Sequence, residues 1–212
     1  MRDFVAVSPI NSSDLMLVVH PSVQAKTVGE LIALAKTKPG KINYASSGNG
    51  TPYHMAGELF KYLAGVDMTH IPYKGSAAAR TAVVGGQVDV MIDAVTTMTE
   101  FSRDGRVRGL ATTGRKRSTI MPDMPTVAEA GVPKYEMSIW LGIMAPKGTP
   151  APIVARLNEE IRKIVSRPEV RDAWAKQGAF PMIMSTNEFT QFLDADIAQW
   201  ATVVKVSGAK PD

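Results

Sequence analysis

The chain of 212 residues contains no cysteine. Without thiols it can form neither a disulfide nor a thiolate metal site, and a cysteine nucleophile is excluded. It also has no apolar run long enough to cross a membrane as a helix, and Met1–Ile10 does not have the pattern of a signal peptide. Its hydrophobic fraction of 45% and charged fraction of 21% are ordinary for a globular protein. Its length allows one large domain or two small lobes.

Several functional classes lack their sequence signatures. The formal net charge is only +4, and the densest basic run, Arg115–Arg117, contains no aromatic residue, so we expect no nucleic-acid partner. The three histidines have no HxxxH or HExxH spacing, which predicts no metal site. There is no GxSxG elbow and no evident pair of carboxylates for acid–base chemistry, so we expect neither an enzyme nor a cofactor.

The most informative stretch is Ile42–Gly65, with the sequence INYASSGNGTPYHMAGELFKYLAG. A strand-like run is followed by a loop of small residues, and a helical pattern begins at Pro52. Thr51 suits the N-cap of that helix, and Gly65 suits the position just past its end. A glycine-rich turn at a helix N-terminus is typical of an anion site, because backbone N–H groups can approach the ligand and the helix dipole favours negative charge.

This loop does not identify its ligand. Gly48-Asn49-Gly50 lacks the third glycine of a dinucleotide fingerprint, because Tyr53 stands there, and no P-loop lysine follows. A tight turn without any ligand remains an alternative. If the loop binds an anion, a carboxylate and a phosphate fit equally well.

Strand-like and helix-like patterns alternate along the chain, which predicts a largely parallel sheet covered on both faces. The expected strands are Asp3–Ser8, Leu15–His20, Ile42–Ser46, Met68–Pro72, Val88–Asp93 and Val107–Thr112. The first two are expected to be separate strands on either side of a polar turn. Three capping boxes, which begin at Thr27, Thr126 and Ser185, each predict the start of a helix.

Three further residues follow predicted strands or the loop. Asp93 ends a strand at the carboxyl edge of the sheet, where open α/β sheets bind ligands, although it suits the N-cap of the next helix equally well. Thr51 and Tyr73 also follow strands, so we expect three strand ends to converge on one crevice. His54 lies in the first helical turn after the loop, where it faces either a ligand or the helix surroundings.

Four sequence blocks together resemble the Bug family, the solute-binding receptors of tripartite tricarboxylate transporters. The blocks are PGKINYASSGNGTPYHMAGELF, HIPYKGSAAARTAVVGGQVDVMID, MPDMPTVAEAGVP and WLGIMAPKGTPAPIVARLNEEI. They occur in the family's order and the resemblance covers nearly all of the 212 residues. Agreement in four separate blocks is far more specific than agreement in one.

The resemblance implies an α/β fold of the two-lobed, Venus-flytrap periplasmic binding type. Such a receptor holds a small carboxylate in its cleft, commonly a di- or tricarboxylate, an acidic amino acid or an aromatic acid, and delivers it to membrane-embedded transporter subunits. In the family one loop from each lobe grips the ligand, and the second-lobe loop matches Ser46–Thr51 here. The predicted ligand-binding residues are Ser46, Ser47, Gly48, Asn49, Gly50, Thr51, His54, Tyr73 and Asp93.

The chain departs from the family pattern at its start. The family's opening βαβ segment, with a proline- and glycine-rich loop and an aspartate, has no counterpart, so we expect a fragment or a shortened gene product. We expect residues 1–14 to be a remnant of lobe one, residues 15–117 to be lobe two, and residues 118–212 to be a connector and the mainly helical remainder of lobe one. With lobe one incomplete, we expect weak ligand binding and self-association.

Two alternatives from other functional classes share parts of the pattern. An effector-binding domain of a transcriptional regulator has the same two-lobed topology, and a helix-turn-helix before Met1 would favour it. A small α/β enzyme acting on an anionic substrate would be favoured by turnover of a phosphorylated compound. We prefer the receptor, because the sequence shows no helix-turn-helix and no evident catalytic base or metal ligands.

Overall fold

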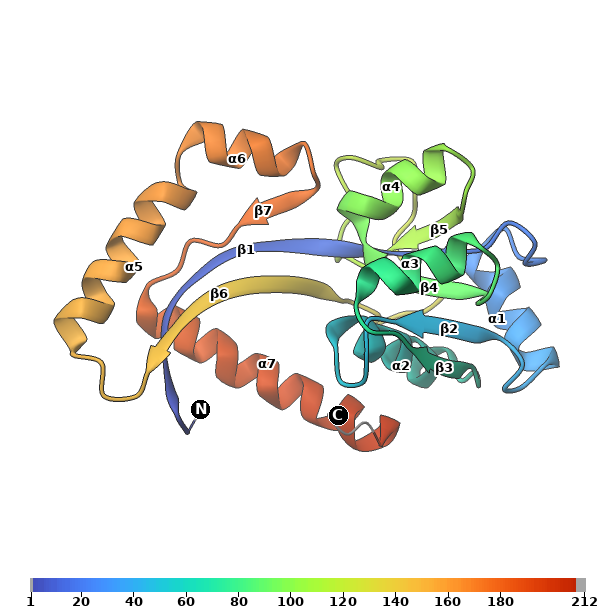
Figure 1. The fold of residues 1–212 in the computed structure, drawn as a ribbon, viewed down its shortest axis with the longest axis horizontal. Coiled ribbons are helices and arrows are strands. Elements are labelled where there is room, and N and C mark those ends of the chain that lie inside the picture. The colour runs from blue at the N-terminus through green and yellow to red at the C-terminus, as the bar shows by residue number, and fades with distance from the viewer. Residues whose placement is uncertain (1, 209–212) are drawn as a thin grey trace. The chain divides into compact units, whose positions relative to one another are not determined.

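A computed structural model describes residues 2–208 as an α/β protein divided into two compact units (Figure 1). The small unit comprises Met1–Ser13 and Ile139–Ala201, and the large unit comprises Asp14–Ser138 and Thr202–Asp212. The long strand β1, Phe4–Val19, contributes its first part to the small unit and its second part to the large unit. Residues 118–138, which we expected to group with the C-terminal part of the chain, lie in the large unit.

The large unit contains a five-stranded sheet in the order β3-β2-β4-β1-β5. Besides β1 its strands are β2 (Asn43–Ser46), β3 (Thr69–Pro72), β4 (Val90–Ala94) and β5 (Arg108–Thr112). Strand β2 pairs in parallel with β3 and β4, whereas β1 runs antiparallel to both β4 and β5. The expectation of a parallel sheet is therefore confirmed for the four strands that alternate with helices, and it is wrong for β1.

Helices cover both faces of this sheet. They are α1 (Val28–Thr37), α2 (Pro52–Ala64), α3 (Ser76–Val84) and α4 (Val95–Arg103). Met16, Val18 and Ala45 form one buried cluster with apolar side chains of α3 and α4. Side chains alternate across a strand, so Tyr44 points to the other face, where its ring lies directly against Gly57 of α2.

The start of the chain forms one strand where we expected two. Asn11, Ser12 and Ser13 do not turn, because they pair in an antiparallel ladder with Ala179–Pro181, which is β7. That ladder satisfies their backbone groups in an extended conformation, which the polar side chains alone did not indicate.

Two of the three capping boxes start helices. The hydroxyl of Thr27 accepts a hydrogen bond from Glu30 N–H at the start of α1, and Glu188 accepts one from Ser185 N–H at the start of the long helix α7, Thr186–Ser207. The third box forms the same pair of hydrogen bonds between Thr126 and Glu129, but no helix follows. There the backbone of 125–127 pairs with Thr112 of β5 instead, so the prediction of a helix is wrong.

The small unit combines two strands that pair with β1 and three helices. They are β6 (Ser138–Pro146), α5 (Ala151–Val165), α6 (Pro168–Ala175), β7 and the first part of α7. Its centre is an aromatic cluster in which Trp140 meets Phe189 and Phe192 edge-on, with ring centroids 5.8 and 5.4 Å apart. Ala6 and Leu193 complete this buried cluster.

Candidate functional site

The predicted anion loop joins β2 to α2, and its last residue caps the helix. The Oγ1 of Thr51 accepts a hydrogen bond from His54 N–H (3.4 Å) and donates one to the carbonyl oxygen of Gly48 (2.8 Å). Pro52 lies in the first turn of α2, and Gly65 ends the helix with a left-handed φ of 61°. The predicted strand, loop and capped helix are confirmed.

Three backbone N–H groups of this loop donate hydrogen bonds within the protein. Gly48 N–H donates to Ser46 Oγ (3.2 Å), Gly50 N–H donates to His54 Nδ1 (3.1 Å), and Thr51 N–H donates to Gly48 O (3.4 Å). We expected backbone N–H groups of this loop to approach a ligand, and at these three positions the N–H groups are bonded within the protein instead. A ligand must compete with Ser46 Oγ, His54 Nδ1 and Gly48 O for these donors or use other groups of the loop.

The nine predicted residues divide into a rim and a buried support. The rim residues, all at least partly exposed, are Ser47, Gly48, Asn49, Gly50, Thr51 and Tyr73. The support residues Ser46, His54 and Asp93 are only 0%, 5% and 0% exposed. The six rim residues are accessible to solvent, whereas the three support residues are buried.

The turn after β3 is tied directly to the loop. Tyr73 N–H donates to Ser46 O (3.0 Å), and Gly75 N–H donates to Ser47 O (3.2 Å). These bonds extend the parallel β2–β3 ladder beyond the strand ends. The predicted convergence of the loop and Tyr73 is therefore confirmed, and Asp93 lies on the neighbouring strand β4.

Asp93 is paired with a residue that the sequence interpretation missed. Its carboxylate accepts hydrogen bonds from Arg80 Nε and Nη2 and from Ala94 N–H (2.7 Å). The N-cap of α4 is Ala94, so the alternative role of Asp93 as a cap is wrong. The sequence carried a usable signal, since Arg80 is the one charged residue in the apolar helix SAAARTAVV.

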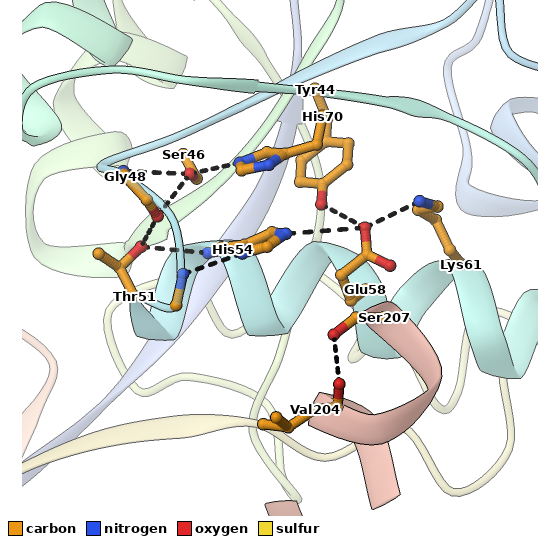
Figure 2. A network of polar contacts seen from close by, with 11 residues as sticks. Tyr44, Ser46, Gly48, Thr51, His54, Glu58, Lys61, His70, Val204 and Ser207 are labelled. Atoms are coloured by element: carbon orange, nitrogen blue, oxygen red, sulfur yellow. Dashed lines mark hydrogen bonds and ion pairs between the residues drawn. The ribbon is translucent and has the colours of Figure 1, made fainter. Parts of the chain in front are cut away.

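Behind the loop lies a buried polar network on β2, β3 and α2 (Figure 2). Glu58 Oε1 accepts hydrogen bonds from Tyr44 Oη (2.6 Å) and Lys61 Nζ (2.8 Å) and lies 3.9 Å from His54 Nε2. The imidazoles of His54 and His70 stack with centroids 3.8 Å apart and planes 6° apart. The histidines are far apart in the sequence, but the β2–β3 pairing sets His70 beside Tyr44 and thus over α2.

Burial sets the protonation of this network. It lowers the pKa of His54, where the attraction of Glu58 only partly opposes it and Lys61 lowers the pKa further. Burial and the neighbouring His54 lower the pKa of His70 to about 4. Burial and the bond to Glu58 raise the pKa of Tyr44. At neutral pH both imidazoles are therefore uncharged, and Tyr44 keeps the proton that it donates.

Other features of the described chain do not add to this site. A cavity of about 700 Å³ lies between the start of α1 and the segment 121–130, and none of its lining residues belongs to the predicted site. Within residues 2–208 no group of three His, Asp or Glu side chains is arranged to hold a metal ion. In the same range, no helix combines the length and apolar character of a membrane span.

Comparison with known sequences gives a consistent family. The model of the tripartite tricarboxylate transporter family receptor matches residues 1–209. The protein BugT of Bordetella pertussis is 37% identical over 210 residues, which is 99% of this chain and 64% of BugT. The chain thus spans about two thirds of the length of this relative, and 53% of a Pseudomonas relative that is 40% identical.

Solved structures agree on the fold. An R. palustris protein, Rpa4515 with adipate, is 34% identical with a TM-score of 0.91, over 99% of this chain and 70% of that one. MatC from Rhodopseudomonas palustris with bound malate is 29% identical with a TM-score of 0.85, over 95% of this chain and 69% of that one. The chain has the α/β fold of periplasmic binding proteins, and its homologues are solute-binding receptors rather than enzymes.

Proposed function

This chain belongs to the tripartite tricarboxylate transporter receptor family, and we propose that it acts in the periplasm as a receptor that captures a small carboxylate for membrane-embedded transporter subunits. The ligand class is a di- or tricarboxylate, an acidic amino acid or an aromatic acid. The neighbours with adipate and malate support the dicarboxylates first. We further propose that the large unit corresponds to lobe two and the small unit to part of lobe one.

The observation that carries this proposal is the loop at the start of α2. It places Thr51, two glycines and the N-terminus of a 13-residue helix at the carboxyl ends of neighbouring parallel strands. The N-terminal end of a helix carries partial positive charge, which stabilises a carboxylate beside it. The remaining rim residues, Ser47, Asn49 and Tyr73, are partly exposed, and Tyr73 N–H donates to Ser46 O at the start of the loop.

Calorimetry with malate, adipate, citrate, glutamate and benzoate tests the proposal. It is performed on this chain and on a longer chain that includes the family's opening segment. We expect a dicarboxylate to bind the longer chain and to bind this chain weakly, because a contact with one jaw stays exposed to water. Absence of binding by both chains would contradict the proposed function.

Gly50→Ala gives a sharper test of the loop. Gly50 has a φ of 71° and open space around an added Cβ, so alanine strains the backbone without a steric clash, at a cost of about 1 kcal/mol. Gly105→Ala is the matched control, since Gly105 has a φ of 69°, equally open space, and lies in a turn outside the site. We expect the first variant to lose at least tenfold in carboxylate affinity and the second to keep the original affinity.

We also propose that this chain associates with itself through its small unit. In the part of the chain that the structure describes, eleven large apolar side chains are exposed, and nine of them lie in that unit. Leu141 and Ile143 point the same way along β6 and are 60% and 40% exposed. Such patches favour association with another chain. Sedimentation should show oligomers at micromolar concentration, and Leu141→Lys should shift the protein toward monomer; a monomer throughout would contradict this.

A further inference from the structure

Each glycine of the anion loop is linked by hydrogen bonds to one of the two stacked histidines, Gly50 directly and Gly48 through Ser46. Gly50 N–H donates directly to His54 Nδ1 (3.1 Å). Gly48 N–H donates to Ser46 Oγ (3.2 Å), and Ser46 Oγ in turn lies 2.6 Å from His70 Nε2. The imidazole pair thus fixes both backbone positions at which the loop takes the left-handed conformations that glycine allows.

The bond from Gly50 fixes the protonation state of His54. A ring nitrogen accepts a hydrogen bond only when it carries no proton, so Nδ1 is bare and the neutral ring carries its proton on Nε2. That N–H faces Glu58 Oε1 at 3.9 Å. If Nδ1 of His54 also gained a proton, its N–H would face the N–H of Gly50. Two donors cannot form a hydrogen bond, so the bond from Gly50 to His54 would be lost.

The groups packed around His54 give little support to a charged ring. From α2, Glu58 faces it, but this carboxylate is already engaged by Lys61 at 2.8 Å and, from β2, by Tyr44 at 2.6 Å. From β3, His70 stacks on the ring at 3.8 Å, so one imidazolium opposes another. His54 is 5% exposed, and water cannot solvate the charge.

We propose that His54 and His70 are positioning residues for the loop 47–51, and that the loop keeps its binding shape only while the His54 ring is neutral, so that carboxylate affinity falls as the pH falls. This inference rests on the proposed function for the identity of the ligand. Burial lowers the pKa of His54, so the loop keeps its shape at neutral pH and loses it in acid. Below the midpoint, affinity falls about tenfold for each pH unit.

The test follows the Gly50 amide and the imidazole nitrogens by NMR from pH 7.5 to pH 4, with malate calorimetry over the same range. We expect the Gly50 amide resonance to move with the same midpoint as His54, and affinity to fall below it. His54→Asn keeps an acceptor near the Nδ1 position but cannot titrate there, and it should abolish the step in the Gly50 amide. His20→Asn, outside the network, is the control and should leave the step in place.

Two further variants separate this mechanism from a general effect of acid. Glu58→Gln removes the negative charge that faces His54 and should lower the midpoint, whereas Lys61→Gln removes a positive charge and should raise it. Opposite shifts are not expected from simple loss of stability.

Several results would overturn the inference. They are a Gly50 amide that does not titrate with His54, shifts of the same sign in the Glu58 and Lys61 variants, or affinity that rises in acid through attraction of the ligand to an imidazolium. If no carboxylate binds at any pH, the proposed function fails separately, and the Gly50 amide still decides whether His54 holds the loop.

Discussion

The two units of this chain differ in how many of their apolar side chains are buried. Among the residues whose burial the structure describes, the large unit contributes 37 of the 45 buried hydrophobic residues. The small unit contributes 8 of them, and nine of the eleven large apolar side chains that are exposed. The five-stranded sheet of the large unit has helices on both faces, which cover its apolar side chains. The small unit has only two strands and three helices beside the first part of β1, and these leave apolar side chains exposed. The large unit thus buries most of its apolar side chains within itself, while the small unit leaves apolar faces exposed.

The largest effect is expected from a substitution in the aromatic cluster of the small unit. Phe189 is completely buried in the aromatic cluster with Trp140 and Phe192. Phe189→Ala should lower the stability of the small unit by about 4 kcal/mol, because a large cavity opens in a core with few other members. Hydrogen exchange should show loss of protection in α5–α7 and unchanged protection in β2–β4. Equal loss in both regions would mean that the units unfold together. The difference in burial between them would then not correspond to a difference in stability.

The ion pair of the large unit gives the next largest effect. Asp93→Ala leaves Arg80 without its buried partner, and we expect a loss of about 3 kcal/mol in the free energy of unfolding. In the small unit Arg156 and Glu160 form an exposed pair on α5, and Arg156→Ala should leave stability unchanged within error. Urea denaturation measures both. A small effect at Asp93 would indicate that Arg80 finds water or another partner.

Tight packing behind the loop supplies a smaller effect. A Cβ at Gly57 would overlap the ring of Tyr44, whose hydroxyl is fixed to Glu58. Gly57→Ala should destabilise the large unit by about 1–2 kcal/mol, since overpacking outweighs the better helix propensity of alanine. Gly29→Ala on α1 is the matched control, because its Cβ meets nothing closer than 4.0 Å, and it should be neutral or stabilising. Equal effects of both substitutions would show that Tyr44 can move.

Local signals in the sequence predicted local structure well. The N-cap Thr51, the terminator Gly65 and the capping boxes at Thr27 and Ser185 act through neighbours within four residues, so the sequence contains all that they need. The box at Thr126 failed because a distant strand, β5, took its backbone hydrogen bonds. The continuous β1 was missed for the same reason, since its polar middle is held by β7.

Some features of the candidate site could likewise be predicted from local sequence, and others could not. The loop and the position of Tyr73 follow from strand order and glycine placement, and both were predictable. Arg80 and His70 reach their partners only through the tertiary pairing of α3 with β4 and of β3 with β2. Spacing along the chain cannot show such pairings. It therefore gave no sign that His54 and His70 stack or that Asp93 pairs with Arg80.

The smallest predicted effect concerns Asp14, the first residue of the large unit on β1. Burial, and secondarily repulsion from Glu136, raise the pKa of Asp14 from its ordinary 3.8 to about 6. A raised folded-state pKa means that the neutral acid stabilises the fold: this contribution is complete below pH 3.8 and is lost as the pH rises through about 6. Asp14→Asn should therefore stabilise the protein at pH 7.5 by about 1 kcal/mol, after discounting for solvent screening, and should have no effect near pH 3.5. Urea denaturation at the two pH values measures the difference, with Glu136→Gln as a weaker change of the same sign. A loss of stability at pH 7.5 would instead show that the ionised carboxylate holds a favourable contact where β1 passes into the large unit.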